Sequence, residues 1–258
     1  MPHDLYRWTF IKMPVARRTS KDTEERADTR RNIKVAARRL FAERGLEAVT
    51  VREIVAAAGA KNGGSLNYYF KSKEGLIFEL ITEIFSDLSV VWLERISALD
   101  RKGGPETVRE IVDIIVRAPN ADAYSDPAPT AHRFLASVLF VRRKELSNYL
   151  DRMNFLVFRR LLEMINSLCT HVPEPVMRQR LIFFAWYVLS VQAAHEAWRA
   201  SRKRSDVWTQ TDPLLNLVDT ATALLEAGSP AESGEVKPTR AGRAKRAAKT
   251  SEAAPPVS

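Results

Sequence analysis

The chain has 258 residues, 45% of them hydrophobic, and carries 40 Lys and Arg against 31 Asp and Glu, a formal charge of +9. This content can bury one or two substantial cores, and the basic excess favours a phosphate-bearing partner. The single cysteine, Cys169, excludes an intrachain disulfide, and the longest apolar run, Leu181 to Val191, is too short for a membrane span, so we expect a cytoplasmic protein without a membrane partner.

The amino-terminal residues 1–28 carry no clear structural signal and are predicted to be a disordered or poorly ordered extension. The next segment has apolar residues at positions i, i+4, i+7 and i+8, which predict an amphipathic helix. These residues are Ile33, Ala37, Leu40 and Phe41, and Gly45 ends the helix.

Two shorter helices follow. Thr50 and Glu53 have the spacing of a capping box, which predicts the start of a second helix that Gly59 ends. After a polar connection, Ser65 is placed to cap a third helix over residues 66–70. This third helix is too short to be stable alone, so it must pack on the first two and turn its polar residues outward.

The order LFAERGLEAVTVREIVAAAGA, then SLNYYFKSKEGL, resembles the amino-terminal domain of the TetR family of bacterial transcriptional regulators. The resemblance is specific because it needs the Phe-x-x-x-Gly turn, the Thr-capped helix, the Ala-Gly break and the Tyr-x-Phe-x-Ser-Lys-Glu run together. It implies a helix-turn-helix DNA-binding head of three helices over residues 29–75. Two features depart from the family pattern: the connection over 60–64 is one residue longer than usual, and Tyr69 stands where His is frequent.

The resemblance and the outward position of the side chains together assign candidate DNA contacts. The candidates for base or groove contacts are Arg52, Lys61, Asn62, Ser65 and Asn67. The candidates for phosphate contacts are Thr50, Tyr68, Tyr69 and Lys73. For each residue the competing interpretation is a solvated surface or a packed aromatic ring.

Residues 76–228 are predicted to form a helical regulatory and dimerisation domain, since apolar residues repeat every three to four positions and no segment alternates with period two. The whole chain is therefore expected to be all-α, with about nine helices. A long helix from Ser72 to about Leu99 crosses from the head into this body, and Pro105 starts the next one. Further helices are expected near residues 130–143, 145–169, 176–202 and 213–226, with a loop over 118–130.

The helix near 176–202 has two apolar stripes, so both sides must be buried. The first stripe comprises Met177, Leu181, Phe184, Val188, Val191, His195 and Trp198. In TetR-like proteins the last two long helices pair across a two-fold axis, which implies a homodimer here. The predicted interface consists of Trp186, Leu189, Ala193, Leu214, Leu217, Ala221 and Leu224. The competing interpretation is a larger monomer core.

The resemblance also implies a small-molecule pocket in the body whose filling lowers operator affinity. The aromatic bias of the body favours an apolar effector such as an acyl or aromatic compound. The predicted lining is Phe134, Val138, Phe155, Phe158, Phe183 and Tyr187, with His132, Asn154, Gln192 and His195 as polar anchors. An aromatic stripe at helical spacing is also typical of plain core, and that alternative stays open.

Residues 229–258 are rich in Ala, Pro, Ser, Lys and Arg and are predicted to be a disordered basic tail. An enzyme is not expected, because the histidines lack metal-ligand spacing, no phosphate-binding loop is visible, and neither a metal nor a cofactor is indicated. The predicted function is a ligand-responsive repressor that binds a palindromic double-stranded DNA operator. The competing class is a nonspecific architectural DNA-binding protein, which the basic tail favours.

Overall fold

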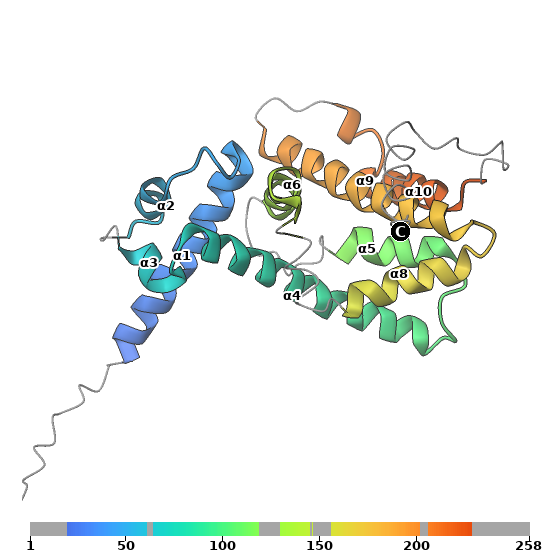
Figure 1. Cartoon of the computed structure of the whole chain (residues 1–258), viewed down its shortest axis with the longest axis horizontal. Coiled ribbons are helices and arrows are strands. Elements are labelled where there is room, and N and C mark those ends of the chain that lie inside the picture. Colours follow the sequence, from blue (N-terminus) through green and yellow to red (C-terminus); the bar gives the residue numbers. More distant parts are fainter. Residues whose placement is uncertain are drawn as a thin grey trace, which may run out of the picture.

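The computed structural model describes residues 20–60, 64–118, 130–144, 146, 156–201 and 206–228. Within these residues the protein contains nine α-helices, one short 3-10 helix and no strand, which confirms the all-α prediction. The helices are α1 (Ser20–Arg44), α2 (Val51–Ala57), α3 (Ser65–Phe70), α4 (Lys73–Asp100), α5 (Val108–Arg117), α6 (Ala131–Val141), α8 (Leu156–Leu168), α9 (Glu174–Ala200), η2 (Asp206–Trp208) and α10 (Pro213–Glu226). Figure 1 shows α1 to α3 as a head at one end and α5 to α10 as a body at the other.

Helix α1 begins earlier than the sequence predicts. It starts at Ser20, so residues 20–28, expected to belong to a disordered extension, form its first turns. Residues 24–28 are exposed on every side, and a helix without an apolar stripe gives no periodic signal. Acidic residues in the first turns favour the helix because they lie near its positive end. Residues 1–19 lie outside the described part of the chain.

Helix α4 joins the head to the body, as predicted. The Ser72 hydroxyl caps it by accepting a hydrogen bond from the Gly75 amide. The helix contacts α1 and α3 in the head and α5 and α8 in the body. Three ion pairs hold it against α1: Arg30 to Glu79 at 2.6 Å, and Lys34 to Glu83 at 2.8 Å and to Glu79 at 3.8 Å. Helix α4 is therefore in direct contact with both the head and the body.

One predicted boundary in the body needs correction, and another lies largely outside the described residues. Helix α5 begins at Val108 rather than at Pro105, because Thr107 and Glu110 form a capping box that sets its first turn. The helix predicted over 145–169 is described only as α8, Leu156–Leu168, and most of its expected first part lies outside the described residues. No helix in the described residues is long and apolar enough to cross a membrane.

Helix α9 buries a stripe that is partly charged. Its buried residues are Met177, Arg180, Phe184, Val188, Gln192 and Glu196, whereas Leu181, Val191, His195 and Trp198 of the predicted stripe are only half-buried. The Arg180 guanidinium donates to the carbonyl oxygens of Leu225 at 2.9 Å and Ala227 at 2.6 Å, and so caps the end of α10. Burial of this cation is compensated by backbone acceptors that the helix end leaves unpaired.

Candidate nucleic-acid interface

The start of α2 is fixed by the predicted capping box. The Thr50 hydroxyl accepts a hydrogen bond from the Glu53 amide, and the Glu53 carboxylate accepts one from the Thr50 amide at 2.8 Å. Arg44 at the end of α1 pairs with the same carboxylate at 2.8 Å. These contacts, led by the Thr50 backbone hydrogen bond, lower the pKa of Glu53 to about 2. Thr50 is exposed beside the turn into α2, but its hydroxyl is already engaged.

Helix α3 has one buried and one exposed side. Leu66 and Phe70 are buried against the rest of the head, while Asn67 and Tyr68 are exposed, and Tyr68 retains 65% of its accessible surface. The predicted cap is corrected here: Gly64 occupies the N-cap position, and Ser65 is the first helical residue.

The aromatic pair at the end of α3 divides between surface and core. The Tyr69 ring is half-buried and meets the Tyr68 ring edge-on, with ring centroids 4.9 Å apart. Tyr69 also packs against the buried core of the head. Tyr69 is therefore partly a packed aromatic ring, which was the interpretation competing with DNA contact. Tyr68, in contrast, is mostly exposed.

The junction between α3 and α4 is tight. The Ser72 amide donates to the Phe70 carbonyl at 2.8 Å, which makes a γ-turn centred on Lys71, whose φ of 66° lies in the left-handed region. A Cβ atom added at Gly75 would lie 2.2 Å from the Phe70 carbonyl oxygen. Only glycine allows this approach, so Gly75 sets how close α3 lies to α4.

Lys73 has a structural partner within the head. Its ammonium donates to the Leu46 carbonyl at 2.6 Å and lies 5.7 Å from the centre of the Phe41 ring. This contact could not be predicted from the sequence, because Leu46 is distant from Lys73 along the chain. Lys71, two residues earlier, is exposed and was not among the predicted phosphate contacts.

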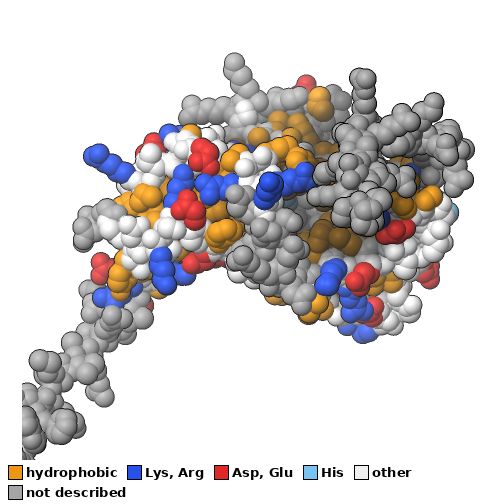
Figure 2. Space-filling model, in the orientation of Figure 1, with side chains coloured by type: hydrophobic (Ala, Val, Ile, Leu, Met, Phe, Trp, Pro, Cys, Tyr) orange, Lys and Arg blue, Asp and Glu red, His pale blue; other side chains and the backbone are white. Residues whose placement is uncertain are grey.

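The remaining predicted DNA contacts fall into two groups. Arg52 is exposed on α2, and Ser65 is half-buried at the start of α3. Lys61 and Asn62 lie outside the described residues. On the face shown in Figure 2, basic side chains on the head are interspersed with acidic ones, so charge alone does not mark the interface.

Helix α6 links the head to the interior of the body. Phe134 of α6 stacks on Phe41 of α1 with ring centroids 6.0 Å apart. Arg38 of α1 donates to the Thr130 hydroxyl at 3.1 Å. At the other end of α6, Arg142 pairs with Glu47 in the head at 2.9 Å. This contact, through its hydrogen bond and its charge, lowers the pKa of Glu47.

The predicted pocket residues occupy several places in the described structure. His132, Phe134, Val138 and Gln192 are buried around the α6–α9 contact, which is the largest helix contact of the body. Phe158 stacks on Trp92 of α4 at 5.5 Å. Of the other predicted residues, Tyr187 bonds to Thr220 at 2.7 Å, and His195 stacks against both Trp198 and Trp208. Phe183 is 57% exposed, and Asn154 and Phe155 lie outside the described residues.

Two of the predicted dimer residues face the interior of their own subunit. Leu217 and Ala221 are almost fully buried in the core, where α10 packs on α5 and α9, so they are removed from the predicted interface. Trp186, Leu189, Ala193, Leu214 and Leu224 are half-buried. The exposed apolar residues of the same two helices are Ile182, Phe183 and Leu215. The sequence pattern shows that α10 is amphipathic but not which neighbour covers its apolar side.

The head belongs to a known class of DNA-binding domain. Residues 33–80 match the family described as bacterial regulatory proteins, tetR family. The amino-terminal domain is therefore a TetR-family helix-turn-helix domain, as the sequence motifs predict.

Comparison with known proteins gives two kinds of relative. Over 88 residues the chain is 39% identical to the HTH-type transcriptional repressor KstR2 of Rhodococcus jostii (strain RHA1), a match that covers 34% of this chain and 43% of that protein. The chain thus spans less than half the length of this curated relative.

Two solved structures share the overall fold. A putative tetR family transcription regulator from Shewanella sp. PV-4 matches with a TM-score of 0.53 and 16% identity, over 75% of this chain and 96% of that one. Mycobacterium smegmatis AmtR matches with a TM-score of 0.50 and 15% identity, over 95% and 99% of the two chains. At these identities the likeness concerns the fold alone.

Proposed function

We propose that the protein is a sequence-specific transcriptional repressor that binds a palindromic operator as a homodimer and leaves it when a small apolar molecule binds the body. The observation that carries the proposal is the exposure of Asn67 and Tyr68 on a short helix whose other side is buried. A helix held rigidly on a compact head can enter the major groove with its exposed side chains. The TetR-type head and the repressor KstR2 as a relative support this assignment.

Within this proposal the side chains of the head have separate roles. Asn67 contacts a base edge, since an amide can pair with the two hydrogen-bonding atoms of adenine in the major groove. Arg52, Ser65, Lys61 and Asn62 supply further groove contacts. Thr50, Tyr68 and Tyr69 contact phosphates, which position the head without reading sequence.

Phosphate contact by Lys73 needs a qualification drawn from its geometry. Its ammonium already donates to Leu46, so it can reach a phosphate only with its remaining hydrogens. Lys71 carries an exposed cation at the same junction, and we add it to the proposed phosphate contacts.

Release of DNA follows from the position of α6. Because α6 packs on Phe41 and pairs with Glu47, an effector that displaces His132, Phe134 or Val138 also shifts the head. The protein would then have two conformations, which differ in the position of α6. An effector shifts their populations only if it binds the two conformations with different affinity. In a dimer that change alters the spacing of two heads, and with it the affinity for a palindrome.

Competition binding tests this function. Fluorescence anisotropy with DNA flanking the gene should show a site preferred over random duplex by orders of magnitude. Asn67→Ala should weaken binding to that site by about tenfold or more and reduce the preference. Asn166→Ala, which changes an exposed Asn of α8 in the body, is the matched control and should bind as the unaltered protein does.

Two results would contradict the proposal. Equal affinity for the flanking DNA and random duplex would indicate the nonspecific architectural protein instead. Unchanged operator affinity in both Asn67→Ala and Tyr68→Ala would show that α3 is not the recognition helix.

A further inference from the structure

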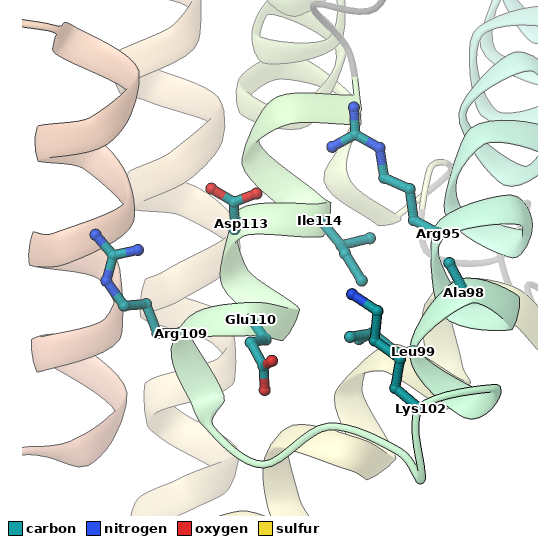
Figure 3. A pocket seen from close by; sticks show the side chains of 8 residues that line it. All are labelled: Arg95, Ala98, Leu99, Lys102, Arg109, Glu110, Asp113 and Ile114. Carbon is teal, nitrogen blue, oxygen red and sulfur yellow. The ribbon is translucent and has the colours of Figure 1, made fainter.

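A cleft opens between the end of α4 and the start of α5, away from the predicted pocket residues. Its volume is about 320 Å³, at the lower end of the range for small-molecule sites. Eight residues line it: Arg95, Ala98, Leu99, Lys102, Arg109, Glu110, Asp113 and Ile114. None of them was predicted from the sequence to line a pocket, and Figure 3 shows how their side chains lie.

One side of the cleft is formed by the end of α4 and the turn that follows it. Arg95, Ala98 and Leu99 lie at i, i+3 and i+4 on one face of α4, and Lys102 lies in the turn after its last residue, Asp100. Figure 3 shows Ile114 of α5 facing Leu99, with the Lys102 side chain running along Leu99 so that its ammonium points towards Ile114. The Arg95 guanidinium lies on the other side of Ile114, so the cleft combines an apolar surface with two cations.

Two of the three charges on the α5 side are paired with an opposite charge. Arg109 pairs with Asp219 of α10, and Asp113 pairs with Arg117 at 2.7 Å. Glu110 accepts hydrogen bonds from the amides of Glu106 and Thr107 in the capping box of α5. Glu110 therefore keeps its negative charge in the cleft, where Lys102 is the cation that acts on it, whereas Arg109 and Asp113 are each neutralised by a partner.

Arg95 and Lys102 differ from these residues. Within the described part of the chain, neither side chain has a hydrogen bond or an ion pair, although Lys102 exerts a longer-range attraction on Glu110. Arg95 is half-buried, which makes an uncompensated charge there more costly than on an open surface. A bound anion would remove that cost.

The geometry points to the α4–α5 cleft as a binding site for a small organic anion with an apolar body, such as a carboxylate on an alkyl chain or a ring. The apolar body would cover Leu99 and Ile114, and the anionic group would pair with Arg95 or Lys102. The assignment of the cleft as a binding site does not depend on DNA binding. Its regulatory meaning rests on the proposed function, because α4 connects the cleft to the head.

Isothermal titration calorimetry on the full chain without DNA tests the site with four probes. Octanoate has both the anion and the apolar body, whereas octan-1-ol lacks the charge, octylammonium reverses it and acetate lacks the chain. We expect octanoate to bind at least about tenfold more tightly than each of the other three.

Matched variants locate the binding. Arg95→Gln combined with Lys102→Gln should weaken octanoate by about tenfold and leave octan-1-ol unchanged, because only the charge contact is lost. Arg101→Gln removes a neighbouring exposed cation that does not line the cleft, and should have no effect. Ala98→Phe, which fills the cleft, should weaken octanoate even with both cations present.

Two outcomes would overturn the site: octanoate binds no better than octan-1-ol, or it binds the double Gln variant as tightly as the unaltered protein. Circular dichroism melting confirms that each variant is folded. Operator preference, measured separately on the unaltered protein, decides the proposed function, so either proposal can fail without the other.

Discussion

Glu196 of α9 and His132 of α6 form a buried pair, with Glu196 Oε1 2.7 Å from His132 Nδ1. The same carboxylate accepts hydrogen bonds from the backbone amides of His132 at 3.1 Å and Arg133 at 3.0 Å. The N-cap residue of α6, Thr130, makes no side-chain cap of its own. Glu196, a residue of α9, therefore caps the start of α6. This contact holds α6 in place, and α6 in turn packs on the head.

Glu196→Gln should destabilise the protein while preserving the shape of the side chain. Burial by itself would raise the pKa of Glu196, but the hydrogen bonds from the His132 side chain and the two amides hold it below 4.5, so the native group is a carboxylate. We expect the free energy of unfolding to fall by about 2 kcal/mol in urea denaturation, because charge-assisted hydrogen bonds are weakened. Glu174→Gln, an exposed change on the same helix, is the control. Equal stability of the two variants would contradict the capping role.

The capping box at Thr50 should stabilise the head in a pH-dependent way. The pKa of Glu53 is about 2 in the folded protein against 4.5 ordinarily, so its contribution is complete above 4.5 and is lost as the pH falls through about 2. Thr50→Ala should lower the melting temperature near neutral pH, and this difference should shrink as the pH falls below 4.5. Thermal melts followed by circular dichroism across this interval give the measurement. A difference that stays constant down to pH 2 would show that the carboxylate does not contribute to the cap.

Gly75→Ala should disturb the junction between α3 and α4. The added methyl group would lie 2.2 Å from the Phe70 carbonyl oxygen, so the backbone must shift, at a cost of about 1–3 kcal/mol. Operator affinity should fall as well, because Phe70 ends α3, the proposed recognition helix. Gly64→Ala is the matched control, since a Cβ there meets nothing within 4 Å. Urea denaturation and fluorescence anisotropy of both variants provide the test.

Charges on α9 and α10 should separate dimerisation from folding. Phe183 is 57% exposed, so Phe183→Glu should yield a folded monomer if this face pairs with a second copy. Leu217 is buried within its own subunit, so Leu217→Glu should instead unfold the body. Sedimentation velocity gives the mass and circular dichroism the fold. A dimeric Phe183→Glu variant would place the interface elsewhere.

Local sequence signals determined the head almost completely. These signals act over one or two helical turns: the Thr50–Glu53 spacing, the break at Gly59, and the apolar positions Ile33, Ala37 and Phe41. In the structure the capping box forms, α2 ends before Gly59, and the three apolar residues are buried. Capping and periodicity depend on neighbours in the chain, so they can be read without a fold. Two local predictions in the head differ from the structure: Gly64 rather than Ser65 is the N-cap residue of α3, and α1 begins earlier because a helix exposed on every side leaves no apolar pattern.

Only the tertiary structure decided what the polar groups of the body do. The buried side of α9 continues at intervals of four from Phe184 and Val188 to three polar residues, Arg180, Gln192 and Glu196. From the sequence alone, a charged residue at such a position is ordinarily assigned to the surface. Their burial is possible because α9 crosses the end of α10 and the start of α6, which supply acceptors for Arg180 and donors for Glu196. The partners of Lys73 and the opening of the α4–α5 cleft were hidden for the same reason. Contacts between residues far apart in the chain depend on how the helices cross, and helical periodicity specifies which side of a helix is buried but not which neighbour it meets.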